Sequence, residues 1–242
     1  MTSAKSEGQR KANKVRIVPL PMSVSNAFLL LGDRPVLVDA GAPGEEAKLL
    51  DSLHQHGIAP NDLSLVVLTH GHTDHAGSVN AFSQAGVPIA IGAEDAGLLE
   101  RGANGQLPIT TFAGRALRPL ISRMTFAGAS PQVLVREPLR LDPYGIGATM
   151  VPAPGHTAGS CVVLLDDGDA VVGDILRGGF AYGKIRPHHP LRHFFAEQVA
   201  GVRRGLDRVL EHDPQELYVG HGGPNVSAAD VRRRLDSIAP PK

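Results

Sequence analysis

Three histidines and one aspartate lie close together in the segment that spans residues 69–77 of this chain, namely His70, His72, Asp74 and His75. Imidazole nitrogens and carboxylate oxygens are ligands that zinc takes in proteins, and iron and manganese accept the same donors. The alternative is a polar turn that happens to be rich in histidine. Three imidazoles and a carboxylate at this spacing favour a metal site.

The elements around this cluster should place it at the end of a strand. Residues 63–68 form a short apolar run with adjacent valines, which predicts a buried strand. Residues 76–84 follow a helical pattern that we expect to stop at Gly86. Because a turn directs neighbouring side chains apart, the four side chains cannot all point the same way.

Three later residues could join this cluster. His156 lies in a Pro-Gly-His-Thr segment between two predicted strands, Asp174 follows an apolar strand, and His221 lies between two glycines after another apolar strand. A buried carboxylate at Asp174 would be costly without a metal or another cation. The alternatives are solvated loop histidines and an aspartate that caps a turn.

Together these segments resemble the metallo-β-lactamase superfamily of metallohydrolases. Residues 70–75 match its His-x-His-x-Asp-His signature, and segments 154–160, 171–174 and 218–222 resemble its later stations in the same order. The resemblance covers nearly the whole chain. It implies an α/β fold (α+β by some schemes), specifically a four-layer αβ/βα sandwich with metals at one edge.

The resemblance also implies a ligand set for two divalent metal ions, with zinc as the default and iron or manganese as alternatives. One metal would take His70, His72 and His156, the second would take Asp74, His75 and His221, and Asp174 would bridge both. Asp74 is also expected to hold or accept the proton of the nucleophile. Asp39, which ends another predicted strand, would accept a hydrogen bond from a ligand histidine, with a turn role as its alternative.

Such a site can perform hydrolysis without a side-chain nucleophile. Two dications about 3.5–4 Å apart can hold a bridging hydroxide that attacks a carbonyl carbon or a phosphorus. We therefore expect a hydrolase that cleaves an ester, lactone, thioester or related bond of a small molecule.

Three other functions stay open at this stage. A persulfide dioxygenase-like enzyme would use a single iron, and a non-catalytic binding protein would keep the fold without turnover. Hydrolysis of β-lactams is less favoured, because the resemblance implies that β-lactamases of this fold lack an aspartate at the position of Asp174.

Composition limits the remaining classes. The chain has 242 residues, of which 42% are hydrophobic, and its 24 basic and 24 acidic residues cancel. This balance does not favour nucleic acid or an anionic membrane as a partner, and no apolar run approaches the roughly 20 residues that span a bilayer. Cys161 is the only cysteine, so no internal disulfide can form, and we expect it in the core.

We expect residues 1–14 to form a disordered polar tail and residues 15–242 to form one domain. The tail has no apolar stretch of the kind found in secretory signals, so we expect a cytoplasmic protein. Residues 102–130 are the least regular region and are interpreted as a lid or substrate wall, with a dimer contact as the alternative. A homodimer is left open.

Residues 178–190 are expected to form a glycine-rich loop with a basic surround. Seven basic and three acidic residues lie between residues 175 and 212, so Tyr182, Arg186 and His188 are candidates for binding an anionic group of the substrate. The alternative is a solvated basic loop, and His193 belongs to the same cluster.

The remaining elements follow from periodicity and turn signals. Strands are expected over residues 15–20, 26–31, 36–38, 87–91, 132–135, 139–141, 148–151, 161–165, 170–172 and 216–219. Helices are expected over residues 43–56, 93–101, 191–211 and 227–238, the last with Ser227 as its N-cap.

Overall fold

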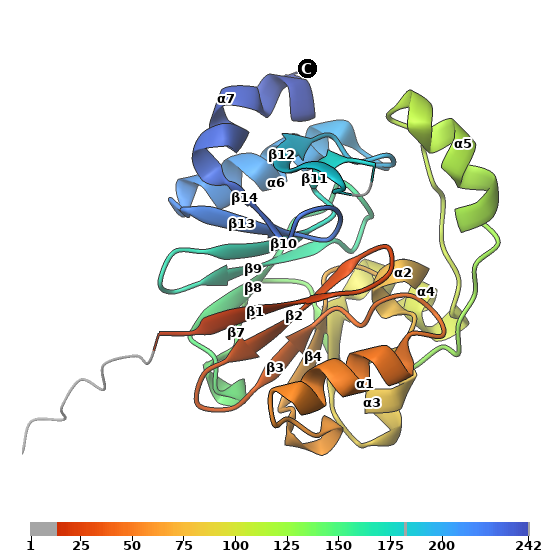
Figure 1. Cartoon of the computed structure of the whole chain (residues 1–242), viewed down its shortest axis with the longest axis vertical. Helices are drawn as coiled ribbons and strands as arrows, with labels where there is room; N and C mark the ends of the chain where they lie inside the picture. The colour runs from red at the N-terminus through yellow and green to blue at the C-terminus, as the bar shows by residue number, and fades with distance from the viewer. Residues whose placement is uncertain (1–13, 182, 242) are drawn as a thin grey trace, which may run out of the picture.

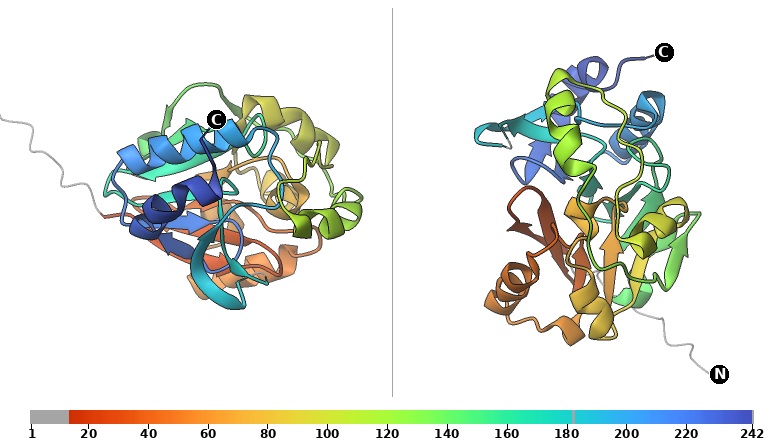
Figure 2. Two further views of the ribbon diagram at one scale, coloured as in Figure 1. Left: turned by 90° about the horizontal axis from the view of Figure 1, so that it is seen from above. Right: turned by 90° about the vertical axis from the view of Figure 1, so that its right-hand side faces the viewer.

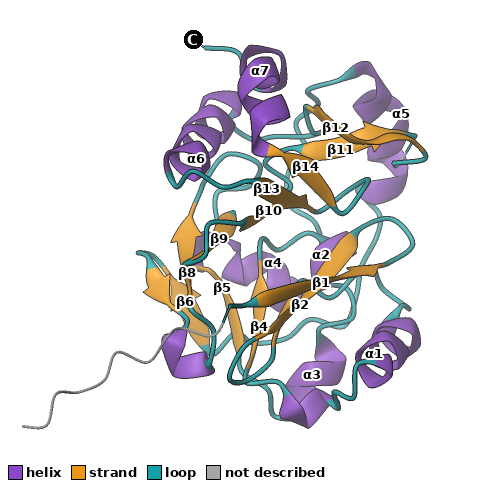
Figure 3. Cartoon of the chain, turned by 60° about the vertical axis from the view of Figure 1, so that its left-hand side comes forward, coloured by secondary structure: helices purple, strands orange, loops and turns teal. Residues whose placement is uncertain are grey.

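Two six-stranded sheets pack face to face, and helices cover their outer faces (Figure 1). The computed structural model describes residues 14–181 and 183–241. The view coloured by secondary structure shows the two sheets between the helical layers (Figure 3). The expected four-layer sandwich is therefore confirmed, whereas the expected tail over residues 1–14 lies outside the described residues except for Lys14.

The first sheet has the strand order β1-β2-β3-β4-β5-β6. Its first three strands pair antiparallel, and β3 to β6 run parallel. The strands are β1 (Arg16–Pro21), β2 (Asn26–Leu31), β3 (Val36–Val38), β4 (Leu65–Leu68), β5 (Ile89–Gly92) and β6 (Val133–Val135).

The second sheet has the strand order β14-β13-β10-β9-β8-β7. Strands β10 and β13 are parallel, and the other neighbours are antiparallel. The strands are β7 (Leu139–Arg140), β8 (Ala148–Pro152), β9 (Cys161–Leu165), β10 (Ala170–Gly173), β13 (Glu216–Val219) and β14 (Asn225–Ser227).

The helices divide between the two outer faces, with one exception. The first sheet is accompanied by α1 (Glu46–Gln55), α2 (Thr73–Ala76), α3 (Asn80–Gln84) and α4 (Ala96–Arg101), and the second by α6 (Val199–Glu211) and α7 (Ala228–Ile238). The exception is α5 (Phe112–Ile121), which stands at the side of the sandwich and faces the viewer in the right panel of Figure 2. Among the described residues, no helix combines the length and apolar character that a membrane crossing needs.

The alternation of side chains along each strand builds the layers. On β2, Phe28 and Leu30 belong to the core between the sheets, whereas Leu29 between them packs in the core under the helices. This is the two-residue period of a strand that is buried on both faces. A third core lies between the second sheet and helices α6 and α7, where Val202 and Leu206 are buried.

Two predicted elements need correction. Residues 178–190 are not a loop, because β11 (Arg177–Phe180) and β12 (Ile185–Leu191) form an antiparallel hairpin. The glycines serve close pairing: a Cβ on Gly178 would lie 2.5 Å from the carbonyl oxygen of Pro187. The helix expected over residues 191–211 begins only at Val199, because tertiary contacts hold the preceding segment in an extended form, including a hydrogen bond from His156 to the Phe195 carbonyl.

Two further predictions were incomplete. The helix expected over residues 76–84 is two short helices, α2 and α3, and the first already contains Asp74 and His75. Residues 102–130 contain the ten-residue helix α5, which was not predicted because Gly114 and Pro119 obscure its pattern. By contrast, the side chain of Ser227 caps α7 as expected by accepting a hydrogen bond from the Asp230 amide.

Candidate metal centre

The seven predicted ligands converge at one edge of the sandwich, where several strands end. His70 and His72 follow β4, Asp74 and His75 lie on α2, and His156 follows β8. Asp174 and His221 follow the parallel strands β10 and β13. Strand ends from both sheets therefore supply the cluster, which is why residues distant in the sequence meet there.

The first group consists of His70, His72 and His156, whose candidate ligand atoms lie within 4.8 Å of one another. The Nε2 atom of His156 is 3.0 Å from Nδ1 of His72. All three side chains are buried. Burial is the main cause that lowers the pKa of each, so the rings are neutral at neutral pH and keep the lone pair that a metal requires.

The second group consists of Asp74, His75 and His221. The Nε2 atom of His221 lies 3.3 Å from Oδ2 of Asp74 and 3.4 Å from Nε2 of His75. Burial opposes a charge on His221, but Asp174 and Asp74 outweigh it and raise its pKa to about 10. The carboxylates therefore create a negative field at this position, which a bound cation would neutralise.

Asp174 lies between the two groups. Its Oδ2 atom is 3.5 Å from Nε2 of His156 and 3.2 Å from Nε2 of His221, and its Oδ1 atom is 3.4 Å from Nε2 of His75. Gly220 makes this approach feasible, because a Cβ there would lie 2.2 Å from Oδ1 of Asp174. One carboxylate thus reaches both groups, which is the geometry of a bridging ligand.

Hydrogen bonds on the outer nitrogen fix the orientation of four of these imidazoles. The partners of the Nδ1 atoms are Thr69 Oγ1 for His70 (3.1 Å), Asp39 Oδ2 for His75 (2.8 Å), the Phe195 carbonyl for His156 (3.0 Å) and the Val24 carbonyl for His221 (2.6 Å). A proton on Nδ1 leaves the lone pair on Nε2, directed into the cluster. Such outer partners orient metal-binding histidines.

Asp39 supports two of these rings from beneath the cluster. It is fully buried and adopts a φ of 60°, a left-handed conformation that aspartate tolerates better than most residues. Its carboxylate contacts His75 directly and accepts hydrogen bonds from the amide and hydroxyl of Thr69, whose hydroxyl in turn contacts His70. Asp39 therefore lies against His75, one of the candidate ligand histidines, and its supporting role stays a prediction.

Asp95 is a supporting residue that the sequence analysis missed. It is buried, and its carboxylate accepts hydrogen bonds from the Gly71 amide (2.9 Å), the Thr157 hydroxyl (2.7 Å) and the Gly159 amide (2.9 Å). It thus joins the loop of His70 and His72 to the loop of His156. Acidic residues are common in a first helical turn, so the sequence offered no distinct signal.

His193 belongs to the cluster, although the sequence analysis placed it in the basic surround. Its Nε2 atom is 3.1 Å from Oδ2 of Asp174, and it forms a third candidate group with His156 and Asp174. Its Nδ1 atom faces both the carbonyl (3.1 Å) and the amide (3.3 Å) of Phe195. Either tautomer therefore has a partner at Nδ1, so Nε2 can carry a proton or a lone pair.

The cluster fits a metal centre on the chemistry of its unpaired atoms. Among the described residues, four buried side-chain atoms lack a hydrogen-bond partner: Nε2 of His70, His72 and His193, and Oδ1 of Asp174. All four belong to this cluster. Buried polar atoms are rarely left unpaired in native proteins. A bound cation would pair with these imidazole nitrogens and this carboxylate oxygen.

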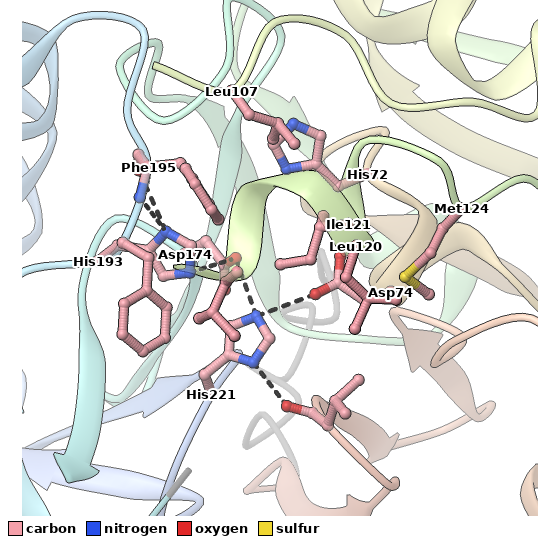
Figure 4. Close-up of a pocket in the computed structure, with 13 residues that line it drawn as sticks. His72, Asp74, Leu107, Leu120, Ile121, Met124, Asp174, His193, Phe195 and His221 are labelled. Carbon is pink, nitrogen blue, oxygen red and sulfur yellow. Dashed lines mark hydrogen bonds and ion pairs between the residues drawn. The ribbon is translucent and has the colours of Figure 1, made fainter. Parts of the chain in front are cut away.

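A pocket of about 370 Å³ opens over the cluster (Figure 4). One side is the metal wall, which we define as His72, Asp74, Asp174, His193 and His221. The facing side is the apolar wall, which we define as Leu107, Leu117, Leu120, Ile121 and Met124. Val24, Phe194 and Phe195 complete the lining.

The residues predicted to bind an anionic group lie elsewhere. Arg186 and His188 are exposed on β12 and are absent from the lining of the pocket. His188 uses Nδ1 in a contact with the Asn225 carbonyl, 2.9 Å away. Tyr182 lies outside the described residues. The assignment of these three residues to substrate binding stays a prediction.

The fold and this cluster define a metal-binding αβ/βα sandwich. The chain belongs to the metallo-beta-lactamase superfamily, whose family profile matches residues 20–241. A "probable metallo-hydrolase" of Methanocaldococcus jannaschii is 25% identical over 82% of this chain and 87% of its own length.

Two further comparisons agree with this family. "Metallo-beta-lactamase domain-containing protein 1" of Xenopus laevis is 34% identical over 59% of this chain and 48% of its own length, so the match covers about half of that relative. A solved metallo-beta-lactamase family protein from Thermus thermophilus shares the fold, with a TM-score of 0.63 and 23% identity, over 92% of this chain and 77% of that one.

Proposed function

We propose that this protein is a dinuclear metallohydrolase that cleaves an ester, lactone, thioester or related bond of a small molecule. The observation that carries the proposal is that imidazole nitrogens of both groups reach the carboxylate of Asp174, in a cluster that also holds four buried side-chain atoms without a hydrogen-bond partner. The family and the metallo-hydrolase description of the M. jannaschii relative support the same reaction class.

The two groups would each hold one divalent cation, with zinc as the expected metal and iron or manganese as alternatives. His70, His72 and His156 would hold the first, Asp74, His75 and His221 the second, and Asp174 both. Bound there, the cations would acidify a shared water and polarise the bond that is cleaved. The contribution of the chain itself would be to hold these ligands and the substrate in position.

We expect Asp74 to handle the proton of the attacking water. It lines the pocket and is less buried than its histidine neighbours. Burial raises its pKa, but His221 and His75 outweigh this effect and hold the pKa well below its ordinary value. Asp74 is therefore ionised at neutral pH and can accept a hydrogen bond from the nucleophile.

A mononuclear iron centre is the main competing function. The second group argues against it, because Asp74 and His221 lie 3.3 Å apart and His75 is aligned by Asp39. Metal analysis separates the two functions, because about two zinc-like ions per chain favour hydrolysis and one iron with oxygen uptake favours the dioxygenase. A cytoplasmic location stays a prediction, whereas turnover of β-lactams and a homodimer stay open alternatives.

One experiment tests the proposed reaction. The zinc-loaded protein is assayed on esters, lactones, thioesters, phosphodiesters and β-lactams, beside His72→Ala and the matched control His54→Ala, an exposed histidine on α1 outside the pocket. We expect hydrolysis of a carbonyl substrate by the wild type and the control, and its loss in His72→Ala. Oxygen uptake by an iron-loaded protein without any hydrolysis would overturn the proposal.

A further inference from the structure

We propose that the natural substrate carries a neutral, apolar chain beside the bond that is cleaved, and that this chain lies against the apolar wall. The inference rests on the proposed function and names its substrate class. The expected recognition surface is α5 and the segment that follows it, in place of the basic residues of the β11–β12 hairpin.

The composition of the pocket carries the first step. Every lining residue that is not part of the metal wall is apolar: Val24, Leu107, Leu117, Leu120, Ile121, Met124, Phe194 and Phe195. Within residues 14–181 and 183–241, no lysine or arginine lines the pocket. An anionic substituent next to the scissile bond would therefore find no lysine or arginine of these residues in this space, whereas an aliphatic chain would find apolar contacts on several sides.

A basic side chain that contacts the lining is already engaged. Arg177 stacks on the ring of Phe194 at 4.2 Å and donates a hydrogen bond to the carbonyl of Arg192, 3.1 Å away. It completes the packing behind Phe194 and is absent from the residues that line the pocket.

The exposure of the apolar wall carries the second step. Leu120 lines the pocket yet is 71% exposed, and Leu117, Ile121 and Met124 are only half-buried. On α5 only Gly114 is buried. Apolar side chains left at the mouth of a pocket gain burial when an apolar group occupies it, so the protein keeps there the surface that such a substrate would cover.

The attachment of this wall carries the third step. The side chain of Asn104 donates to the Ile121 carbonyl (2.8 Å) and accepts from the Thr73 amide (2.9 Å), directly beside Asp74. At the other end, the Thr110 amide donates to the Phe194 carbonyl (3.0 Å), and Ile109 and Phe195 form a bridge. The apolar wall is thus tied to both sides of the metal centre, so a chain lying along it starts at the reacting bond.

The size of the pocket limits the chain. A volume of about 370 Å³ is at the lower end of the range for ligand pockets. We therefore expect the benefit of added methylenes to stop within a series of medium length.

A chain-length series tests the inference with two readouts. The first is hydrolysis of neutral p-nitrophenyl esters, from the acetate to the dodecanoate, by the zinc-loaded protein. We expect kcat/KM to rise by about fourfold for each methylene that enters the pocket and then to level off. The second is calorimetric binding of the matching linear carboxylates, which requires no turnover and should follow the same trend.

Two substitutions on one helix localise the effect. Leu120→Ser lies on the apolar wall, whereas Phe112→Ser, at a residue 88% exposed on the same helix, lies outside the pocket. We expect Leu120→Ser to flatten the dependence on chain length in both readouts and Phe112→Ser to leave it as in the wild type. If substitutions on α5 unfold the protein, Phe112→Ser will also lose hydrolysis and carboxylate binding.

The outcomes separate this inference from the proposed function. Flat or falling kcat/KM with chain length, equal behaviour of the two variants, or a preference for a succinyl over a neutral ester of equal length would overturn the inference while hydrolysis remains. Carboxylate binding that rises with chain length in a protein that hydrolyses nothing would support the inference and overturn the proposed function.

Discussion

The two sides of the pocket are built in opposite ways. The metal centre lies at strand ends, and the imidazoles of His75, His156 and His221 are buried and oriented by hydrogen bonds to Asp39 and to backbone carbonyls. The apolar wall comes from a helix and its flanks, is only partly buried apart from Leu107, and is attached through contacts such as those of Asn104. The difference teaches that the core fixes the position of the reactive groups, whereas an attached segment shapes the space for the substrate.

The sharpest way to break this comparison is to remove the residue that both metal positions share. Asp174→Ala should lower the metal content well below that of the wild type and abolish hydrolysis, because the carboxylate contacts both groups. Elemental analysis of the dialysed protein measures the first effect. His54→Ala is the control, and wild-type metal content in Asp174→Ala would contradict the bridging role.

Stability should separate the two regions next. Leu30 is fully buried between the sheets, so Leu30→Ala should destabilise the protein by about 2–5 kcal/mol. Leu120→Ala should change the free energy of unfolding by less than about 0.5 kcal/mol, because Leu120 is largely exposed. Urea unfolding at a fixed zinc concentration measures both, and similar values would show that the apolar wall belongs to the core.

Substitution of Asp95 tests whether the candidate metal centre depends on the hydrogen bonds that this carboxylate accepts. Asp95→Ala leaves the amides of Gly71 and Gly159 without their acceptor, so the loops of His70, His72 and His156 lose their common anchor. We expect zinc affinity to fall by about 10- to 100-fold, as for other outer-sphere partners. Glu94→Ala, at the exposed neighbour, is the matched control. Unchanged affinity in Asp95→Ala would mean that the loops hold their positions unaided.

The smallest expected effect concerns Cys161, which starts β9 and is nearly fully buried. Burial, aided by Asp95, raises the pKa of its thiol to about 12, so the thiol stays protonated at about pH 8. We expect no reaction of the native protein with a chromogenic disulfide reagent, and one reactive thiol per chain after denaturation. Reaction in the native state would show that this part of the metal edge opens readily.

The sequence predicted the residues that gather at the candidate metal centre better than those that form the apolar lining of the pocket. The candidate ligands follow apolar strands, which a local sequence pattern predicts. The family resemblance implied which of these distant residues group around each metal, and the spacing alone did not. Asp95 was missed and His193 was assigned to the basic surround, because their contacts with Gly159 and Asp174 join residues that are distant in the chain.

The structure of the apolar wall and of the segment around Phe194 and Phe195 depends on tertiary contacts, which a local sequence pattern does not show. Helix α5 carries Gly114 and Pro119, which obscure its periodicity, and its N-terminus is fixed by the cap from Thr111. The segment of Phe194 and Phe195 is extended only because its carbonyls accept bonds from Thr110 and His156. Neither arrangement is encoded in a local pattern.

The most direct test of the dinuclear centre is a calorimetric zinc titration of protein stripped of metal with a chelator. We expect about two zinc ions per chain, both lost in Asp174→Ala, and hydrolysis that reaches its maximum only when the second has bound. Saturation at one ion or none, with full hydrolytic activity, would contradict it.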